Sequence, residues 1–414
     1  MMAPNESDTV EAAAPAAEVP GTPIRPVKSA STPPRAQPAP HGESTRPYIN
    51  DQLNSRLPAD IAHGPLAVRW KADLAPEFPS TFVLAGGNRV VTEAPGRWQL
   101  FDGEGKAIGA GKLGAGDVVM DSANGLLYTI DPYGVIEAYH LSDGALAYSV
   151  SISGGEEWQR AFYARRGHEF AIVSFRRLLQ PHAVATPSGV SVDVEDLGNP
   201  IDVQQEIVAS AKQKSRLYFE APRAFAALQG DALVAAIRNE IVVTAFGETV
   251  RRRLLDKFDA GPMSLDESGR IYVLVNQGVP RPSLWVLTQE GERVAAFDPP
   301  IDFSLTGTPP VVGYDHQIYL ASRHEIIMLS AQGAVLWRRP SQGSIVGMAI
   351  TPAGSLIVVE GSAVSAFDAK GERQVLYKSE GESLITPPAM TAGGDLVVAS
   401  TRRLYCLAGA AKPH

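Results

Sequence analysis

The eight histidines are the first candidates for metal or acid–base chemistry, and none forms a ligand motif such as His-x-x-x-His. His168 and His316 occupy equivalent turns, each between two apolar strand patterns. Two such residues from different repeats could converge on one face and bind a metal ion. Turn histidines are more often solvated, so we interpret both as surface residues and expect no metal site.

Three aspartates recur with a regular placement. Asp121, Asp266 and Asp315 each stand where a first strand runs into a turn. A cation-dependent hydrolase would gather carboxylates like these around a divalent metal. An aspartate in a tight turn also accepts hydrogen bonds from backbone amides that follow it. The regular recurrence favours the turn role.

Cys406 is the single cysteine, so no disulfide can form within the chain. It lies in the apolar string Leu404-Tyr405-Cys406-Leu407. An activated nucleophile would need an exposed position beside a base. We therefore expect a buried strand thiol with no catalytic role.

Trp158 stands in a polar loop directly before Gln159 and Arg160. An aromatic ring beside an arginine is typical of a protein contact, and the alternative is a ring folded back onto the core. Basic residues follow this loop, and further polar residues lie in the stretch 199–222, which has some helical character. The candidates for partner binding are Trp158, Arg160, Arg165, Arg166, Arg176, Gln204, Lys212 and Lys214.

Composition limits the function classes. The chain has 414 residues, of which 44% are hydrophobic, so it can bury a sizeable core. Its formal net charge of -8 argues against nucleic-acid binding, which usually requires a basic face. No stretch has the apolar length of a transmembrane helix, and the first residues lack the pattern of a secretory signal. On this evidence alone the chain as it stands would be cytoplasmic.

The chain contains two regions that differ in amino-acid composition. Residues 1–60 are rich in Pro and Ala with few large apolar side chains, which predicts a disordered tail that serves as a spacer. From Leu66 to Gly409 short β-branched and aromatic runs alternate with turns. One turn glycine recurs at intervals of 38 to 58 residues, at Gly105, Gly144, Gly189, Gly247, Gly291, Gly333, Gly371 and Gly409.

These intervals match the four-stranded blade of a β-propeller. The sequence predicts an all-β fold with a single closed propeller of about eight blades, and seven is the alternative because the third and fourth repeats are degenerate. The long interval is interpreted as an insertion at 199–222. Trp98 and Trp285 fall on the third strand of their blades, where a ring packs between neighbouring blades.

The ring must also close. The last repeat supplies three strands and then the chain ends, so a fourth strand has to come from elsewhere. The segment around Trp70 reads Val68-Arg69-Trp70-Lys71, which is similar to the outer-strand string around Trp337. We predict that this N-terminal strand completes the last blade and leaves no unpaired edge.

The turn strings 141–148, 329–337 and 367–371 resemble the docking turn of the quinoprotein-like (PQQ-like) propeller repeat family. This family includes quinone-dependent dehydrogenases and the outer-membrane assembly lipoprotein, a non-catalytic propeller. Its dehydrogenases use a vicinal cysteine pair, a tryptophan beneath the quinone and a calcium-binding acidic set. A chain with one cysteine cannot supply the pair, so we expect no cofactor. The resemblance also implies an extracytoplasmic setting, at variance with the missing signal, and the compartment stays open.

The preferred hypothesis is a non-catalytic scaffold that binds one or more protein partners, in an envelope-associated assembly of bacterial type. The alternative is a small-molecule enzyme that uses the central funnel, either a quinone- or calcium-dependent oxidoreductase or a hydrolase. A purely structural subunit of a larger assembly would differ from the first hypothesis mainly in the permanence of its partner.

Overall fold

The computed structural model describes the chain between residues 55 and 409, with gaps. The described residues are 55–61, 64–74, 82–94, 96–113, 118–122, 124–130, 135–151, 161–166, 169–174, 181–186, 189–191, 224–227, 232–237, 240–245, 251–254, 259–276, 283–300, 308–322 and 324–409. Between residues 151 and 260 mainly the backbone of the strands is described, and few side chains are. The expected insertion at 199–222 and residues 1–54 of the expected tail lie outside the described residues.

Runs of β-branched and aromatic residues form the strands, and Gly, Asp and Asn separate them. The first half of the chain contains β1 (Leu66–Asp73), β2 (Phe82–Gly86), β3 (Arg89–Ala94), β4 (Arg97–Asp102), β5 (Ala107–Lys112), β6 (Val119–Asp121), β7 (Leu126–Ile130), β8 (Val135–His140), β9 (Leu146–Ser151), β10 (Ala161–Arg166), β11 (Glu169–Ser174), β12 (Pro181–Thr186) and β13 (Gly189–Ser191).

The remaining strands continue the same pattern to the end of the described chain. They are β14 (Ala224–Ala227), β15 (Ala232–Ile237), β16 (Glu240–Ala245), β17 (Arg251–Leu254), β18 (Asp259–Leu265), β19 (Ile271–Asn276), β20 (Ser283–Leu287), β21 (Arg293–Phe297), β22 (Val311–Val312), β23 (Ile318–Ala321), β24 (Glu325–Leu329), β25 (Val335–Pro340), β26 (Ile345–Ile350), β27 (Leu356–Glu360), β28 (Ala363–Phe367), β29 (Arg373–Lys378), β30 (Ala389–Met390), β31 (Leu396–Ala399) and β32 (Arg403–Gly409).

These strands pair into eight antiparallel sheets of four, and each sheet is one blade. Blades 1 to 7 are β2–β5, β6–β9, β10–β13, β14–β17, β18–β21, β22–β25 and β26–β29, and blade 8 has the order β1-β32-β31-β30. The prediction of about eight four-stranded blades is confirmed. Among the residues described, no helix has the length and apolar character needed to cross a membrane.

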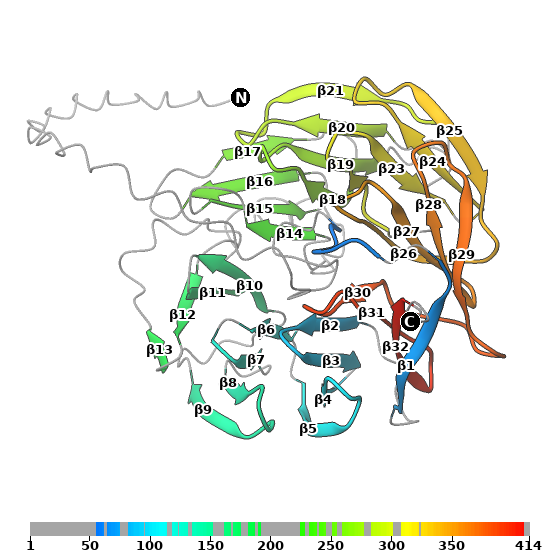
Figure 1. Ribbon diagram of the computed structural model, residues 1–414. Helices are drawn as coiled ribbons and strands as arrows, with labels where there is room; N and C mark the ends of the chain where they lie inside the picture. The colour runs from blue at the N-terminus through cyan, green and yellow to red at the C-terminus, as the bar shows by residue number, and fades with distance from the viewer. Residues whose placement is uncertain are drawn as a thin grey trace, which may run out of the picture. The chain divides into compact units, whose positions relative to one another are not determined.

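Neighbouring blades contact one another all the way round. First strands meet between several blades, as in the contacts β2–β6, β10–β14, β14–β18, β18–β22 and β22–β26. Blades 2 and 3 meet through β9 and β13, and blade 8 contacts blade 7 through β1 and β29 and blade 1 through β30 and β2. Figure 1 shows the resulting ring of blades. The propeller is therefore closed.

Strand β1 closes the ring as predicted. It pairs antiparallel with β32, and Trp70 lies opposite Cys406 and Lys71 opposite Tyr405. The side chain of Trp70 then reaches blade 1, where a Cβ on Gly105 would lie 2.5 Å from the indole Cε3 atom. Gly105 has a φ of 82°, a conformation that favours glycine. Both ends of the described chain thus build one blade and fasten it to the next.

The same fastening recurs at Gly371, whose φ is 75° and whose missing Cβ would lie 2.8 Å from Cδ2 of Trp337. In this turn Oδ1 of Asp368 accepts hydrogen bonds from the backbone amides of Lys370 and Glu372, at 2.9 and 2.8 Å. The aspartate fixes the turn and the glycine makes room for the ring from the preceding blade. This is the docking turn that the sequence pattern indicates.

The core lies between adjacent blades. Trp98 on β4 is fully buried and meets Tyr139 of blade 2 edge to face, with ring centroids 4.8 Å apart. Trp285 on β20 is 3% exposed and packs under the guanidinium of Arg293. The predicted core role of both rings is confirmed, and for Trp98 the predicted place between blades is confirmed as well.

Candidate functional site

Residues 55–61, which we call the strap, precede β1 and run along the end of β26. The backbone amide of Leu57 donates to the carbonyl of Ile350, and the amide of Ile350 donates to the carbonyl of Ser55, both at 2.8 Å. The two segments form a parallel β-bridge at Arg56. Figure 1 shows this segment in blue beside β26. The sequence pattern assigned residues up to 60 to the tail, whereas residues 55–60 form part of this ordered strap.

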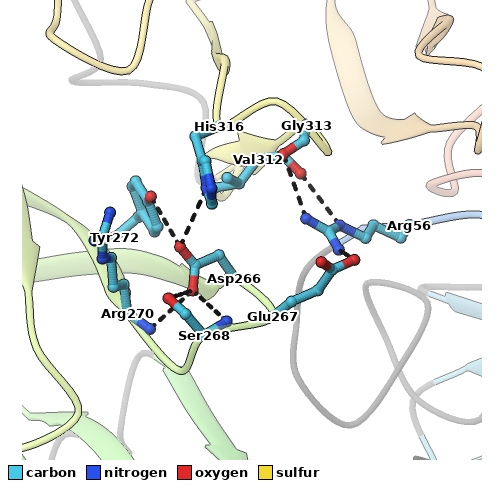
Figure 2. A network of polar contacts seen from close by, with 9 residues as sticks. All are labelled: Arg56, Asp266, Glu267, Ser268, Arg270, Tyr272, Val312, Gly313 and His316. Atoms are coloured by element: carbon cyan, nitrogen blue, oxygen red, sulfur yellow. Dashed lines mark hydrogen bonds and ion pairs between the residues drawn. The ribbon is translucent and has the colours of Figure 1, made fainter.

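The Arg56 side chain joins the strap to two further blades. Its guanidinium donates to the carbonyls of Val312 and Gly313 of blade 6, each at 3.3 Å, and forms an ion pair with Glu267 of blade 5. It also lies over the ring of Tyr314, 4.4 Å from the centroid. Arg56 is only 9% exposed, and these partners compensate for the loss of water around a buried cation. Figure 2 shows the carbonyls and the carboxylate around it.

The rest of the strap is anchored on blades 7 and 8. Leu57 is 1% exposed and belongs to a hydrophobic cluster that includes Leu384, Met390 and Leu396. Asp60 accepts a hydrogen bond from the backbone amide of Ala353, at 2.6 Å. Main chain, cation, leucine and carboxylate of the strap are therefore all bound.

Asp266 lies beside Glu267, in the turn between the first and second strands of blade 5. Its Oδ1 accepts from the backbone amides of Ser268 and Arg270, at 2.9 and 3.0 Å, and from the hydroxyl of Ser268. Its Oδ2 accepts from the hydroxyl of Tyr272 at 3.1 Å and lies 3.6 Å from Nδ1 of His316. The carboxylate is fully buried, and burial together with the nearby Asp266 charge raises the pKa of Tyr272 to about 12. Figure 2 shows this network.

His316 belongs to blade 6 and carries a backbone feature unusual for its type. Its φ is 60°, and its amide closes the first turn by donating to the carbonyl of Gly313. Glycine fills the corresponding place in the turns of blades 5, 7 and 8, at Gly269, Gly354 and Gly394. A left-handed histidine is less favourable than glycine, so this turn stores strain where the side chain meets Asp266.

The three recurrent aspartates do not occupy one equivalent position. Asp266 is the first residue of its turn, and its side chain fixes that turn, as predicted. Asp121 lies one place earlier and holds both the amide and the side chain of Asn124. Asp315 lies two places later and is bonded to the side-chain amide of Gln317. They are turn residues with three different roles, and the part of the chain that is described contains no group of three metal-ligating side chains.

The other candidate residues divide into two groups. Cys406 is buried in β32, as expected, and burial raises the pKa of its thiol to about 12. Arg165 and Arg166 end strand β10, and their side chains are not described. His168 and the remaining partner candidates lie outside the described residues, namely Trp158, Arg160, Arg176, Gln204, Lys212 and Lys214.

Sequence reasoning missed Arg56 as a binding residue. Its neighbours along the chain are those of a Pro- and Ala-rich spacer, and two of its partners are backbone carbonyls. The available signal was the return of large aliphatic residues at Ile49, Leu53, Leu57 and Ile61, after a stretch poor in them.

Comparisons with known proteins extend this picture. No family model matches the chain, and no curated protein matches its sequence. The structure is similar to a europium-containing methanol dehydrogenase, with a TM-score of 0.57 at 9% identity over 89% of this chain and 98% of that one. It is also similar to BamB from Moraxella catarrhalis, with a TM-score of 0.54 at 10% identity over 83% and 100% of the two chains.

A further similar structure is the quinohemoprotein alcohol dehydrogenase ADHIIG from Pseudomonas putida HK5. Its TM-score is 0.58 at 11% identity, over 90% of this chain and 82% of that one. At such identities the likeness describes the fold and leaves the activity open. The resemblance found in the repeat turns is confirmed at the level of fold, because this chain has a β-propeller fold similar to that of these dehydrogenases and of BamB.

Proposed function

We propose that this protein is a non-catalytic propeller scaffold that binds protein partners, as a subunit of an envelope-associated assembly. The observation that carries the proposal is how the charged groups of the first turns are used. Asp266 accepts bonds from its own turn and from Tyr272, and Arg56 is tied to two blades. These groups join structural elements, which favours a rigid platform for binding over an acid–base site.

The binding surface proposed for this scaffold consists of the partner-binding candidates that the sequence pattern indicates. Trp158 and Arg160 supply an aromatic ring and a guanidinium, the side chains that most often dominate interface energies. Arg165, Arg166 and Arg176 would add positive charge, and Gln204, Lys212 and Lys214 would add polar contacts from the stretch 199–222.

Partner capture with the purified full chain tests the proposal. We expect a defined partner to bind in a stoichiometric complex and to be lost when Trp158→Ala and Arg160→Ala are combined. The matched control is Arg338→Ala, which removes an exposed arginine paired with Glu325 on the outer strand β25. Equal recovery of the partner by all three chains would refute the proposed surface, and the absence of any stoichiometric partner would refute the scaffold role.

The second candidate is an enzyme that uses the central funnel, and the likeness to a methanol dehydrogenase and a quinohemoprotein alcohol dehydrogenase favours it. The quinone site implied by the resemblance does not fit this chain, because the single cysteine is buried in β32 and no vicinal pair exists. Calcium and quinone can be tested directly by thermal unfolding. A ligand at about 100 times its dissociation constant adds roughly 2.7 kcal/mol to the folded state, so a rise of several degrees would support the enzyme.

A further inference from the structure

We propose that the first turns of blades 5 to 8 form a peptide-binding site, which the strap occupies in cis. Its ligand in trans is an extended segment of a partner protein in which an arginine is followed directly by a leucine and, three residues after the leucine, by an aspartate. This inference rests on the proposed scaffold function and names the chemistry of one partner segment.

Main-chain recognition is the first argument. The strap is held by two backbone hydrogen bonds to Ile350, the last residue of the first strand of blade 7. Adding a short extended segment to a strand in this way is a common mode of peptide binding, because it depends on backbone atoms that any peptide has. The side chains on either side of the bridge then select the sequence.

The cation subsite is the second argument. Two carbonyls from Val312 and Gly313, the Glu267 carboxylate and the Tyr314 ring surround the guanidinium of Arg56. Carbonyls on one side and a carboxylate on another match the several donors of arginine better than the single ammonium of lysine. The site therefore discriminates in favour of arginine.

Leucine and aspartate fix the register. The side chain of Leu57 enters a hydrophobic cluster formed by blades 7 and 8, and Asp60 accepts a hydrogen bond from the backbone amide of Ala353. Arginine, leucine and aspartate are thus bound by three separate subsites at a fixed spacing. A segment displaced by one residue would place its charged groups in the apolar cluster, at a considerable cost in desolvation.

The residues that bind the strap are held in place by the blades themselves. Every strap contact described above is made by residues between 267 and 396, which belong to blades 5 to 8. The turns that carry these residues are closed by their own backbone bonds, Gly269 to Asp266, His316 to Gly313 and Gly354 to Thr351. A preformed site of this kind can release one peptide and accept another, and the strap then acts as an internal competitor.

The test is a fluorescence anisotropy titration with a labelled synthetic peptide whose sequence is that of residues 52–61. The wild-type full chain is compared with a full chain that carries Arg56→Ala and Leu57→Ala, in which the strap has lost two anchors. We expect the variant to bind the peptide at least about tenfold more tightly than the wild type, because the competing segment is weakened. The same peptide with its arginine replaced by alanine should bind the variant at least about tenfold more weakly than the unmodified peptide.

Two further variants keep the test decisive. If the double variant does not fold, a full chain that carries Asp60→Ala alone tests the same point. It weakens one strap anchor, and we expect its gain in peptide affinity over the wild type to be intermediate. Adding Glu267→Gln to either strap variant should weaken peptide binding several-fold, whereas Arg338→Ala, which removes an exposed arginine on the outer strand β25, should leave it unchanged. Folded strap variants that do not bind the peptide, or that bind it no better than the wild type, would overturn the inference.

Peptide binding and partner binding by the full chain can be lost separately. A partner that still binds the full chain while the peptide does not bind would show that the scaffold uses another surface. Light scattering separates two sources of a bound segment, because capture from a second copy of this chain raises the average mass with concentration and capture from a different protein does not.

Discussion

Single residues decide whether the first turns hold their shape. Asp266 is buried with two backbone amides and two hydroxyls donating to it, so loss of the carboxylate would remove four hydrogen bonds, one of them from the buried Tyr272. The exposed Asp315 occupies a related turn in the next blade and is bonded to one side chain. The two residues form a natural pair for comparison.

We expect Asp266→Ala to lower the free energy of unfolding by about 1–3 kcal/mol, because the first turn of blade 5 loses the acceptor that holds it and the buried Tyr272 hydroxyl loses its bond to the carboxylate. Asp315→Ala should change it by less than about 0.5 kcal/mol, as surface substitutions usually do. Urea denaturation of both variants provides the measurement. A similar loss for both would contradict the role assigned to Asp266.

Cys406 sets a pH dependence with a definite sign. Burial raises the pKa of the folded thiol to about 12, whereas an unfolded thiol titrates near about 8.5. The unfolded chain therefore loses this proton first, and the contribution of the thiol to stability is full below about pH 8.5 and declines as the pH rises towards 12. We expect the free energy of unfolding of Cys406→Ala to fall less steeply than that of the wild type between about pH 9 and 12. Parallel slopes would show that the thiol is not buried in solution.

At the scale of the elements, the glycine of a docking turn needs a left-handed backbone and also leaves room for a neighbouring ring. Blade 7 allows these two requirements to be separated, because the glycine of its first turn has only the first one. Gly354 and Gly371 both have positive φ, at 83° and 75°. A Cβ on Gly354 would meet nothing within 4 Å, whereas one on Gly371 would lie 2.8 Å from the ring of Trp337.

Gly354→Ala should cost about 1–2 kcal/mol, the usual penalty for an L-residue in a left-handed conformation. Gly371→Ala should cost about 1–3 kcal/mol more, because the Trp337 ring must also move. Thermal unfolding of the two variants measures the difference. Equal losses would mean that the ring from blade 6 does not depend on the close approach at Gly371.

The elements also show what sequence could reveal. Turn glycines that recur every 38 to 58 residues indicate the number of blades, and the similarity of the segments around Trp70 and Trp337 indicates the closing strand, because both signals are local in the chain. The meeting of Asp266 with His316 depends on how neighbouring blades pack, and the partners of Arg56 at Val312 and Gly313 are backbone carbonyls that any residue could provide. Contacts of these two kinds cannot be predicted from the residue types alone.

For the whole molecule, closure by β1 protects the ring from pairing with other chains. Strand β32 has β31 on one side and β1 on the other, so without β1 its backbone donors and acceptors would face solvent.

A chain that begins at Leu74 lacks β1, and we expect it to aggregate or to unfold at a markedly lower temperature than a chain that begins at Leu66. The second chain is the matched control, because both lack the strap and differ in β1 alone. Light scattering and thermal unfolding measure the outcome. Two chains with the same mass and the same melting temperature would show that β1 is dispensable.

The pairing of β1 with β32 has a further consequence during synthesis. Leu66–Asp73 leaves the ribosome long before its partner Arg403–Gly409 has been translated. At synthesis rates of about 5–20 residues per second, the early strand waits on the order of tens of seconds for the late one. Closure of the ring must therefore wait until β32 has been made, and until then the nascent protein carries an unmatched strand that chaperones would have reason to shield.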